Sequence, residues 1–410
     1  MGAKPLATNI VMVMAAIAVF AFSLQPKVLK SSRWRATVTP LASIIGSGFL
    51  VAGPILSHAM GNWAWLGMTF LCGVAYLFGV TIRRNIANVE PLLKDNPPRT
   101  LDLLERASNL ALSFAYFISV AYYINLLAAF GLRGAGVIDE TLTRVIATVI
   151  IGALGAIGFF RGLRHMENVE LVAVGAKLSL IGAVIIALVW WATSSALHGG
   201  IHLPEIEHRT GYHELRVLLG LVILVQGFET SRYLGDAYDP AMRISSMRYA
   251  QWLSTVIYIV FILLMTPLFT GRLPPEGGET AIITLLKPVA SYATPMIIVA
   301  ALASQLSAAV ADMNGAGGLL DNALPEKYAP RWGYLMTAVI AIAITWAANI
   351  FEIIVFASKA FVIYYALQAT TAAYMARRRH KLFSWGVVIY ALVAILAFAI
   401  VLLGAPAEGG

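Results

Sequence analysis

Two short glycine-containing motifs interrupt long apolar stretches of this sequence and could place backbone groups where they do chemistry. The first is Gly46-Ser47-Gly48, and the second is Val225-Gln226-Gly227-Phe228-Glu229. Glycine weakens a helix by about 1 kcal/mol relative to alanine, so each motif favours a break in its helix. A broken helix leaves free N–H groups at one end and free carbonyls at the other. The N–H groups suit a carboxylate and the carbonyls suit an ammonium group, so together they match an α-amino acid.

A lysine within an apolar stretch is a candidate for coupling chemistry. Lys177 lies about 15 Å inside the predicted helix over 168–191, at a rise of about 1.5 Å per residue. Charged groups inside such helices are costly and mark functional sites. Desolvation disfavours its ammonium form, so it could carry a coupling proton, or its ammonium could replace a bound sodium ion. We expect it to contact carbonyls near Gly46 and a hydroxyl of Ser304 or Ser307, unless it snorkels to the membrane surface.

Other ionisable and aromatic residues fall inside the predicted helices. Glu229 could gate the site, bind an amine, take a proton or hold its helix to a neighbour. Arg232 lies three residues later, where it could pair with Glu229, snorkel or contact the substrate. Lys359 could bind a second carboxylate or pair with Glu229. Tyr123, on a helix face with Tyr116 and Ser119, is expected to line the site.

The composition identifies the solvent around these residues. Of the 410 residues, 59% are hydrophobic and only 12% are charged, whereas soluble domains carry about 25% charged residues. Lipid must therefore surround much of the chain. The single cysteine, Cys72, excludes an intrachain disulfide and a cysteine-based metal site. The net charge of +8 does not indicate nucleic acid, because Lys and Arg cluster in short loops between apolar stretches. We expect neither a metal nor a cofactor.

The apolar stretches predict an all-α polytopic membrane protein with about twelve transmembrane helices, each crossing a core of about 30 Å. They are expected over 6–24, 36–58, 63–82, 104–132, 143–160, 168–191, 215–234, 249–269, 280–311, 332–348, 351–376 and 383–403. The first stretch could also be a signal peptide, although no convincing cleavage site precedes Lys27. Assigning the more basic loops to the cytoplasm places both termini in the periplasm of a bacterial-type inner (plasma) membrane.

The positions of the two motifs suggest an internal repeat. Each motif begins a group of five helices, over 36–192 and 214–376, and the two groups enter the membrane from opposite sides. This is a 5+5 inverted repeat whose first helix is broken in each half, and such repeats bind substrates near the midplane. Residues 1–35 then form an extra helix and a basic loop, and 377–410 form a basic loop and a last helix.

At these residues the sequence resembles the amino acid–polyamine–organocation (APC) superfamily. Ile45-Gly46-Ser47-Gly48-Phe49 matches its helix 1 motif, and Gly227-Phe228-Glu229 with the later Asp239-Pro240 is similar to its helix 6 region. Leu324-Pro325 resembles the segment before its helix 9. The extra first helix, Arg232 and Leu234-Gly235-Asp236 depart from the family pattern.

The resemblance implies a LeuT-like fold and alternating access around a site between helices 1 and 6. It implies that a substrate carboxylate meets the amides of Gly46–Gly48, including Ser47. The amino group would meet carbonyls near Ile44 and at Val225, Gln226 and Gly227. We also assign Phe228 and Tyr123 to the substrate site. Some members of the family carry a lysine at the position of Lys177.

These features predict a secondary transporter of a small amino acid or amine-like solute, coupled to protons rather than sodium. An alternative is a transporter of a nucleobase or organic anion, which Lys359 and Arg232 would favour. A membrane-embedded lipid-linked transferase would need grouped catalytic residues. The acids expected on the cytoplasmic side, which are Asp236, Asp239, Asp312 and Asp321, show no such spacing.

Overall fold

Helices form every regular element in the part of the chain that the structure describes. The computed structural model describes residues 3–23, 25–46, 48–93, 97–162, 167–206, 211–274, 276–321, 331–379 and 384–407. Eight helical stretches there are long and apolar enough to cross a membrane, and Ala7–Ser23 and Arg331–Ala347 are shorter apolar helices. The chain is therefore a multi-pass, all-helical membrane protein, as the composition predicts.

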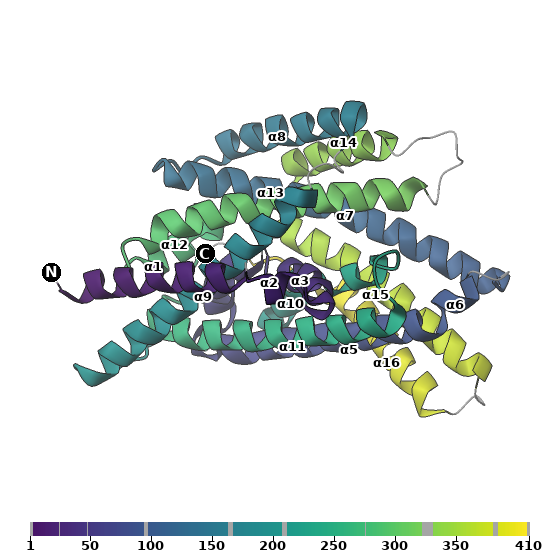
Figure 1. Ribbon diagram of the computed structural model, residues 1–410, viewed down its shortest axis with the longest axis horizontal. Coiled ribbons are helices and arrows are strands. Elements are labelled where there is room, and N and C mark those ends of the chain that lie inside the picture. The colour runs from purple at the N-terminus through teal and green to yellow at the C-terminus, as the bar shows by residue number, and fades with distance from the viewer. Residues whose placement is uncertain are drawn as a thin grey trace.

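Most long helices run close to the long axis of the molecule (Figure 1). The long helices are α1 (Ala3–Ser23), α5 (Ala64–Asn88), α7 (Arg99–Gly134), α8 (Glu140–Arg161), α9 (Glu167–Leu197), α11 (Pro240–Met265), α13 (Ala293–Asp321), α14 (Arg331–Ala347), α15 (Ile350–Arg379) and α16 (Trp385–Leu403), of which α9 crosses the bundle at a steeper angle. The short α2 (Pro26–Leu29), α6 (Glu90–Leu93) and α12 (Ile282–Leu286) lie in connections. So do the 3-10 turns η1 (Gly61–Trp63), η5 (Thr266–Leu268) and η6 (Gly278–Thr280).

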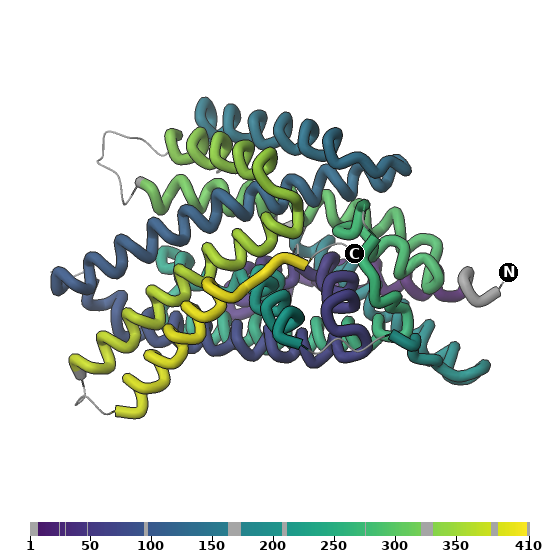
Figure 2. The backbone as a smooth tube through the Cα atoms, turned by 180° about the vertical axis from the view of Figure 1, so that it is seen from behind, coloured from purple at the N-terminus to yellow at the C-terminus, as the bar shows by residue number. Residues whose placement is uncertain are grey.

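Local sequence signals explain where several helices begin. The Asp139 side chain accepts a hydrogen bond from the Leu142 N–H at 2.8 Å and caps the start of α8. Asp239 caps α11 in the same way, and Pro240 occupies the first turn, where its missing N–H costs nothing. In the assembled bundle, α7 packs against both α13 and α15, and α1 packs against α9. Seen from behind, α16 follows α15 along its length (Figure 2).

Two of the expected transmembrane helices are interrupted. The first consists of α3 (Ser32–Ile44) and α4 (Gly48–Met60), separated at the glycine motif. The second consists of α10 (Tyr212–Leu219), η3 (Val222–Val225) and η4 (Phe228–Tyr233), with Gly227 between the two turns at φ = +116°. These segments lie at the centre of the bundle, with α5 and α11 along one side (Figure 1).

The expected helix over 280–311 is wrong at both ends. The structure has the separate α12 first, then Lys287 and Pro288, and only then α13 from Ala293. Proline lacks an N–H and disfavours a helical residue before it, so α12 ends there. Because α13 continues to Asp321, Asp312 lies inside a membrane-crossing helix and not in a cytoplasmic loop. The Leu324-Pro325 segment lies outside the described residues.

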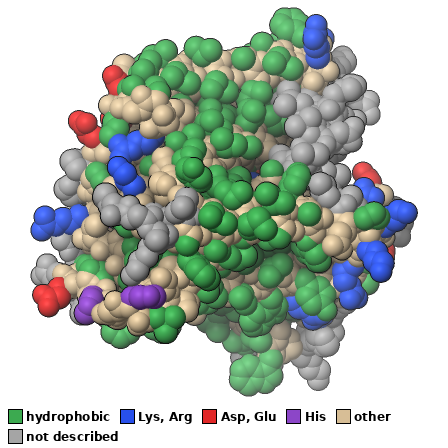
Figure 3. Space-filling view, turned by 60° about the vertical axis from the view of Figure 1, so that its left-hand side comes forward, with side chains coloured by type: hydrophobic (Ala, Val, Ile, Leu, Met, Phe, Trp, Pro, Cys, Tyr) green, Lys and Arg blue, Asp and Glu red, His purple; other side chains and the backbone are tan. Residues whose placement is uncertain are grey.

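The surface has the distribution expected for a protein in a bilayer. Figure 3 shows hydrophobic side chains across the middle of this face, with charged side chains gathered at its two ends. Several large apolar residues of the lipid-facing helices are exposed, among them Val149 in α8 and Ile395 in α16. Exposed apolar surface of this extent is stable only where lipid replaces water.

Candidate functional site

The two interrupted helices meet at their breaks. A Cβ atom added to Gly48 would lie 2.5 Å from the carbonyl oxygen of Leu224 and 2.7 Å from its Cα atom. A Cβ atom added to Gly227 would lie 2.5 Å from Ser43 Oγ and 2.7 Å from the Ser43 carbonyl carbon. Gly227 also has a positive φ, which side chains disfavour. Glycine is required at both positions because each break lies against the backbone of the other. Ser47 lies outside the described residues.

A buried tyrosine joins the carbonyl ends of the two breaks. The Tyr258 hydroxyl lies 3.0 Å from the Ile44 carbonyl oxygen and 2.6 Å from the Leu224 carbonyl oxygen. Tyr258 belongs to α11 and is fully buried. The Ile44 carbonyl, which we expected to face a substrate amine, thus lies within reach of a donor from the protein itself.

Gln226 is the polar side chain at the second break. Its Nε2 atom donates to the Tyr123 hydroxyl at 3.1 Å, which brings the predicted α7 tyrosine to the site. Its Oε1 atom is buried and has no hydrogen-bond partner among the described residues. Buried polar atoms are nearly always paired, so this oxygen is a candidate acceptor for a ligand.

An aromatic stack closes the space next to the second break. Phe228 is fully buried and stacks on Tyr365 of α15, with ring centroids 5.1 Å apart. Tyr365 also stacks on Phe78 of α5 at 4.9 Å. The stack covers the break from the side of α5 and α15.

Glu229 caps the second break instead of pairing with a cation. Its Oε2 atom accepts hydrogen bonds from the Gly227 N–H at 2.9 Å and from the Tyr365 hydroxyl at 2.8 Å. No ion pair joins it to Arg232 or Lys359 among the described residues, so the structure does not show the pairing that was one of the alternatives for each. The reason is local, because the carboxylate can fold back onto a free backbone N–H two residues earlier.

Lys177 lies at the carbonyl end of the first break, as predicted. Its Nζ atom donates to the Ala42 carbonyl oxygen at 3.0 Å. A Cβ atom added to Gly46 would lie 3.2 Å from the same Nζ atom. The side chain is only 6% exposed, so it does not snorkel to the membrane surface. Ser304 of α13 is also buried, and its hydroxyl has no partner among the described residues, whereas Ser307 is half-buried. The helices that carry Lys177 and Ser304 pack against each other.

Arg232 lies in η4, which follows the second break, and belongs to an ion-pair network. Its Nη2 atom lies 2.9 Å from both carboxylate oxygens of Glu105, at the start of α7. Its Nε atom lies 3.7 Å from Glu90, which also binds Arg243 at 2.6 Å. Arg243 in turn donates to the Arg232 carbonyl oxygen at 2.7 Å. The network ties η4 to α6, α7 and α11 on the side predicted to be cytoplasmic.

Comparison with known proteins agrees with this geometry. A family model described as "APC superfamily transporter" matches residues 26–404. The chain belongs to the APC superfamily of transporters. A relative from Aquifex aeolicus (strain VF5), described as an uncharacterized protein, is 41% identical over 391 residues, or 94% of each chain. The protein is thus a membrane transporter, and the family does not consist of enzymes.

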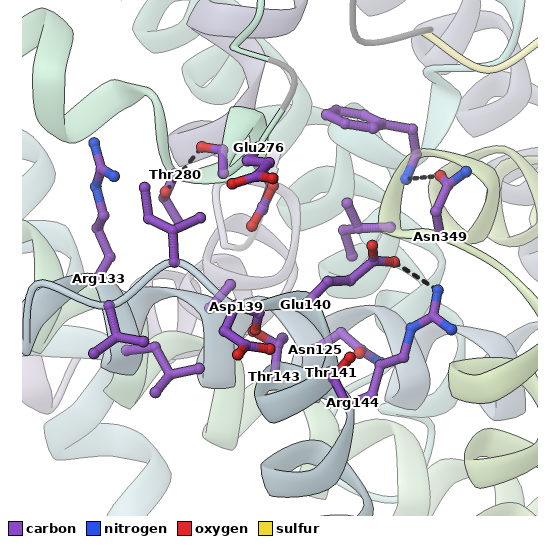
Figure 4. A pocket seen from close by; sticks show the side chains of 18 of the residues that line it. Asn125, Arg133, Asp139, Glu140, Thr141, Thr143, Arg144, Glu276, Thr280 and Asn349 are labelled. Atoms are coloured by element: carbon purple, nitrogen blue, oxygen red, sulfur yellow. Dashed lines mark hydrogen bonds and ion pairs between the residues drawn. The ribbon is translucent and has the colours of Figure 1, made fainter.

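The transporter has a cavity of about 550 Å³ at the opposite end of α7 from Glu105. Figure 4 shows five of the charged side chains around it, which are Arg133, Asp139, Glu140, Arg144 and Glu276, and Glu279 also lines the cavity. Arg144 is paired with Glu140 at 2.6 Å, and burial raises the pKa of Glu279 above its usual range. Asn125 and Ala129 of α7 also line the cavity, so it extends into the bundle.

Two groups of acidic residues with buried or partly buried partners were not found from the sequence. Glu90 and Glu105 lie in loop and helix-start positions, where acids are common, so nothing in their spacing marked them. Asp312 accepts a hydrogen bond from the Ser119 hydroxyl across the contact of α13 with α7. Extending the predicted helix over 280–311 toward the C-terminus would have placed Asp312 inside the membrane and marked it as a candidate.

Proposed function

We propose that this transporter carries a small amino acid or amine-like solute between the two breaks and couples its movement to protons. The observation that carries the proposal is the mutual contact of the breaks at Gly48 and Gly227. Two interrupted helices that face each other inside a membrane protein are costly unless they serve a site. The proposal includes a LeuT-like inverted repeat in the bacterial inner membrane, with both termini in the periplasm.

The breaks offer groups for both ends of such a solute. The first N–H groups of α4 have no acceptor within the helix and would bind a carboxylate at Gly46–Gly48. The unpartnered Gln226 Oε1 atom and the carbonyls of Val225–Gly227 would accept from an amine. Tyr123 and Phe228 would form the walls of the site. As the solute binds, its amine would replace the Tyr258 hydroxyl as the hydrogen-bond donor to the Ile44 carbonyl oxygen.

Lys177 would supply the coupling to protons. Its protonated amine holds the last turn of α3 through the Ala42 carbonyl oxygen. Loss of the proton would remove that charged hydrogen bond and release α3, which is the half-helix that must move for the site to open toward the cytoplasm. Ser304 and Ser307 would take up the amine as it shifts, and Glu229 would hold the second break in place meanwhile.

The charged side chains at the two ends of the bundle favour an amine over an organic anion as the solute. The Arg232 guanidinium, which would favour an anion, is held by Glu105 and Glu90. The cavity at the other end has more carboxylates than guanidinium groups and would concentrate cationic solutes. Lys359 of α15 is half-buried and remains a candidate for a second carboxylate of the solute.

A thermal-shift screen tests this proposal. Purified transporter would be heated with amino acids, amines, nucleobases and organic acids, because a ligand of the folded state raises stability. We expect stabilisation by an amino acid or amine and its loss in Gln226→Ala, with Thr69→Ala of the exposed α5 surface as a control. Stabilisation only by organic acids or nucleobases would overturn the proposed substrate class.

A further inference from the structure

A groove on the outer surface of the bundle lies between the first half-helix and α11. It has a volume of about 640 Å³, and α3 and α11 pack against each other beneath it. Its lining consists of Ser31, Arg33, Trp34, Thr37, Tyr249, Trp252, Leu253 and Val256. The side chains at one end are charged and aromatic, and those at the other end are apolar.

The charged end carries two arginines that form no ion pair with any described carboxylate. Arg33 lies with its guanidinium carbon 5.7 Å from the Tyr249 ring centre, and Arg248 lies 6.0 Å from the same centre. Both side chains are exposed, and neither forms a salt bridge within the described part of the chain. The groove therefore presents uncompensated positive charge at one end.

The apolar end runs along α11 toward the middle of the membrane. Trp252, Leu253 and Val256 are 56%, 39% and 55% exposed, which is suitable only for contact with lipid chains. Trp252 also packs on Tyr76 at 5.5 Å, so its indole ring has a fixed position at the wall. Trp and Tyr with Arg at one level are typical of the membrane–water interface.

We propose that this groove binds one anionic phospholipid. The phosphate group would lie between the guanidinium groups of Arg33 and Arg248, and one acyl chain would lie along Trp252, Leu253 and Val256. Charge complementarity identifies this occupant, because basic pockets between transmembrane helices on the cytoplasmic side suit anionic headgroups. A zwitterionic lipid would carry its own positive charge into the same pocket and would be disfavoured.

The position of this lipid matters for transport. The groove is formed by α3, the half-helix whose last turn holds Lys177 and lies against the second break. A lipid held by Arg33 of α3 and Arg248 of α11 would tie the half-helix to its neighbour. Anionic lipid therefore stabilises the conformation in which α3 packs on α11.

Quenching by brominated lipids tests the site in the full-length transporter. Brominated phosphatidylglycerol would be titrated into phosphatidylcholine vesicles, and the signal of Trp252 would be taken as the difference between wild type and Trp252→Phe. We expect anionic lipid to be preferred at this site by about fivefold for each arginine, so that Arg33→Gln/Arg248→Gln shows no preference. Arg35→Gln, an exposed arginine on the same helix outside the groove, should retain it.

Two results would overturn the inference. One is an equal quenching of Trp252 by brominated phosphatidylcholine and phosphatidylglycerol in the wild type. The other is a preference for phosphatidylglycerol that survives in Arg33→Gln/Arg248→Gln. As a second measurement, the melting temperature in nanodiscs should rise with phosphatidylglycerol in wild type and Arg35→Gln, but not in the double variant.

Discussion

The contact between the two breaks predicts an unusual sensitivity to a single methyl group. Gly48→Ala would place a Cβ atom 2.5 Å from the Leu224 carbonyl oxygen and 3.0 Å from its carbonyl carbon. Carbon and oxygen atoms that are not bonded normally stay more than about 3 Å apart, so something must move. The neighbour is backbone and cannot rotate away, unlike the end of a flexible side chain.

The cost follows from overpacking of a well-packed interior. Small-to-large substitutions that force the backbone to shift cost about 1–3 kcal/mol, and we expect Gly48→Ala at the upper part of this range. Gly53 of the same helix is the matched control, because a Cβ atom there would lie 3.8 Å from the Met265 methyl group, in ordinary contact. Gly53→Ala should therefore be neutral or stabilising by up to about 1 kcal/mol through helix propensity.

Thermal unfolding of the two variants in the same detergent would measure the difference. We expect Gly48→Ala to melt below wild type and Gly53→Ala to melt at or above it. If the two variants melt together, the first break does not lie against Leu224 and the reasoning fails. Solute-induced stabilisation, measured in the same scans, should also be weakened in Gly48→Ala alone.

The remaining predictions concern charged groups. Lys177→Met should abolish uptake driven by a pH gradient while solute exchange without a gradient continues, and loss of both or of neither would contradict a coupling role. Arg232→Gln leaves the partly buried Glu105 without its partner and should cost about 3 kcal/mol of stability by thermal unfolding. Arg106→Gln, which removes an exposed ion pair, should cost less than about 0.5 kcal/mol, so equal losses would refute the distinction. Burial raises the pKa of the Glu279 carboxyl above 4.5, so the folded state binds its proton more tightly than the unfolded state does. The free energy of unfolding therefore falls as the pH rises from about 4.5 through the raised pKa of the folded state. Glu279→Gln should flatten the melting temperature over this pH range, and an unchanged pH profile would contradict the burial.

The membrane-spanning helices and the two breaks could be predicted because each depends on residues that are close together in the sequence. A stretch of about twenty apolar residues needs a helix in lipid, and glycines beside polar residues weaken a helix wherever they occur. Lys177 could be identified as a candidate for the same reason, since a charged side chain deep in an apolar helix is costly and marks a functional site. Its contact with Ala42 O then follows from the free carbonyls at the end of α3.

Partners chosen by tertiary packing were not predictable in this way. Helical spacing placed Arg232 beside Glu229, but η4 is a 3-10 turn and the carboxylate folds back on Gly227. The partner of Arg232 is Glu105, which is distant in the sequence and reached only when α7 packs beside η4. Asp312 was misplaced because Pro288 ends α12 and shifts the membrane segment of α13 toward the C-terminus.

Solute counterflow in proteoliposomes tests most directly whether the two breaks form the transport site. The liposomes would be loaded with the stabilising solute found by thermal shift, and entry of its labelled form would be followed. Gly227→Ala adds a Cβ atom 2.5 Å from Ser43 Oγ at a φ of +116°, whereas a Cβ atom on Gly73 would meet nothing within 4 Å. We predict counterflow in wild type and Gly73→Ala and its loss in Gly227→Ala. Counterflow by a folded Gly227→Ala variant at the wild-type rate and affinity would contradict the account.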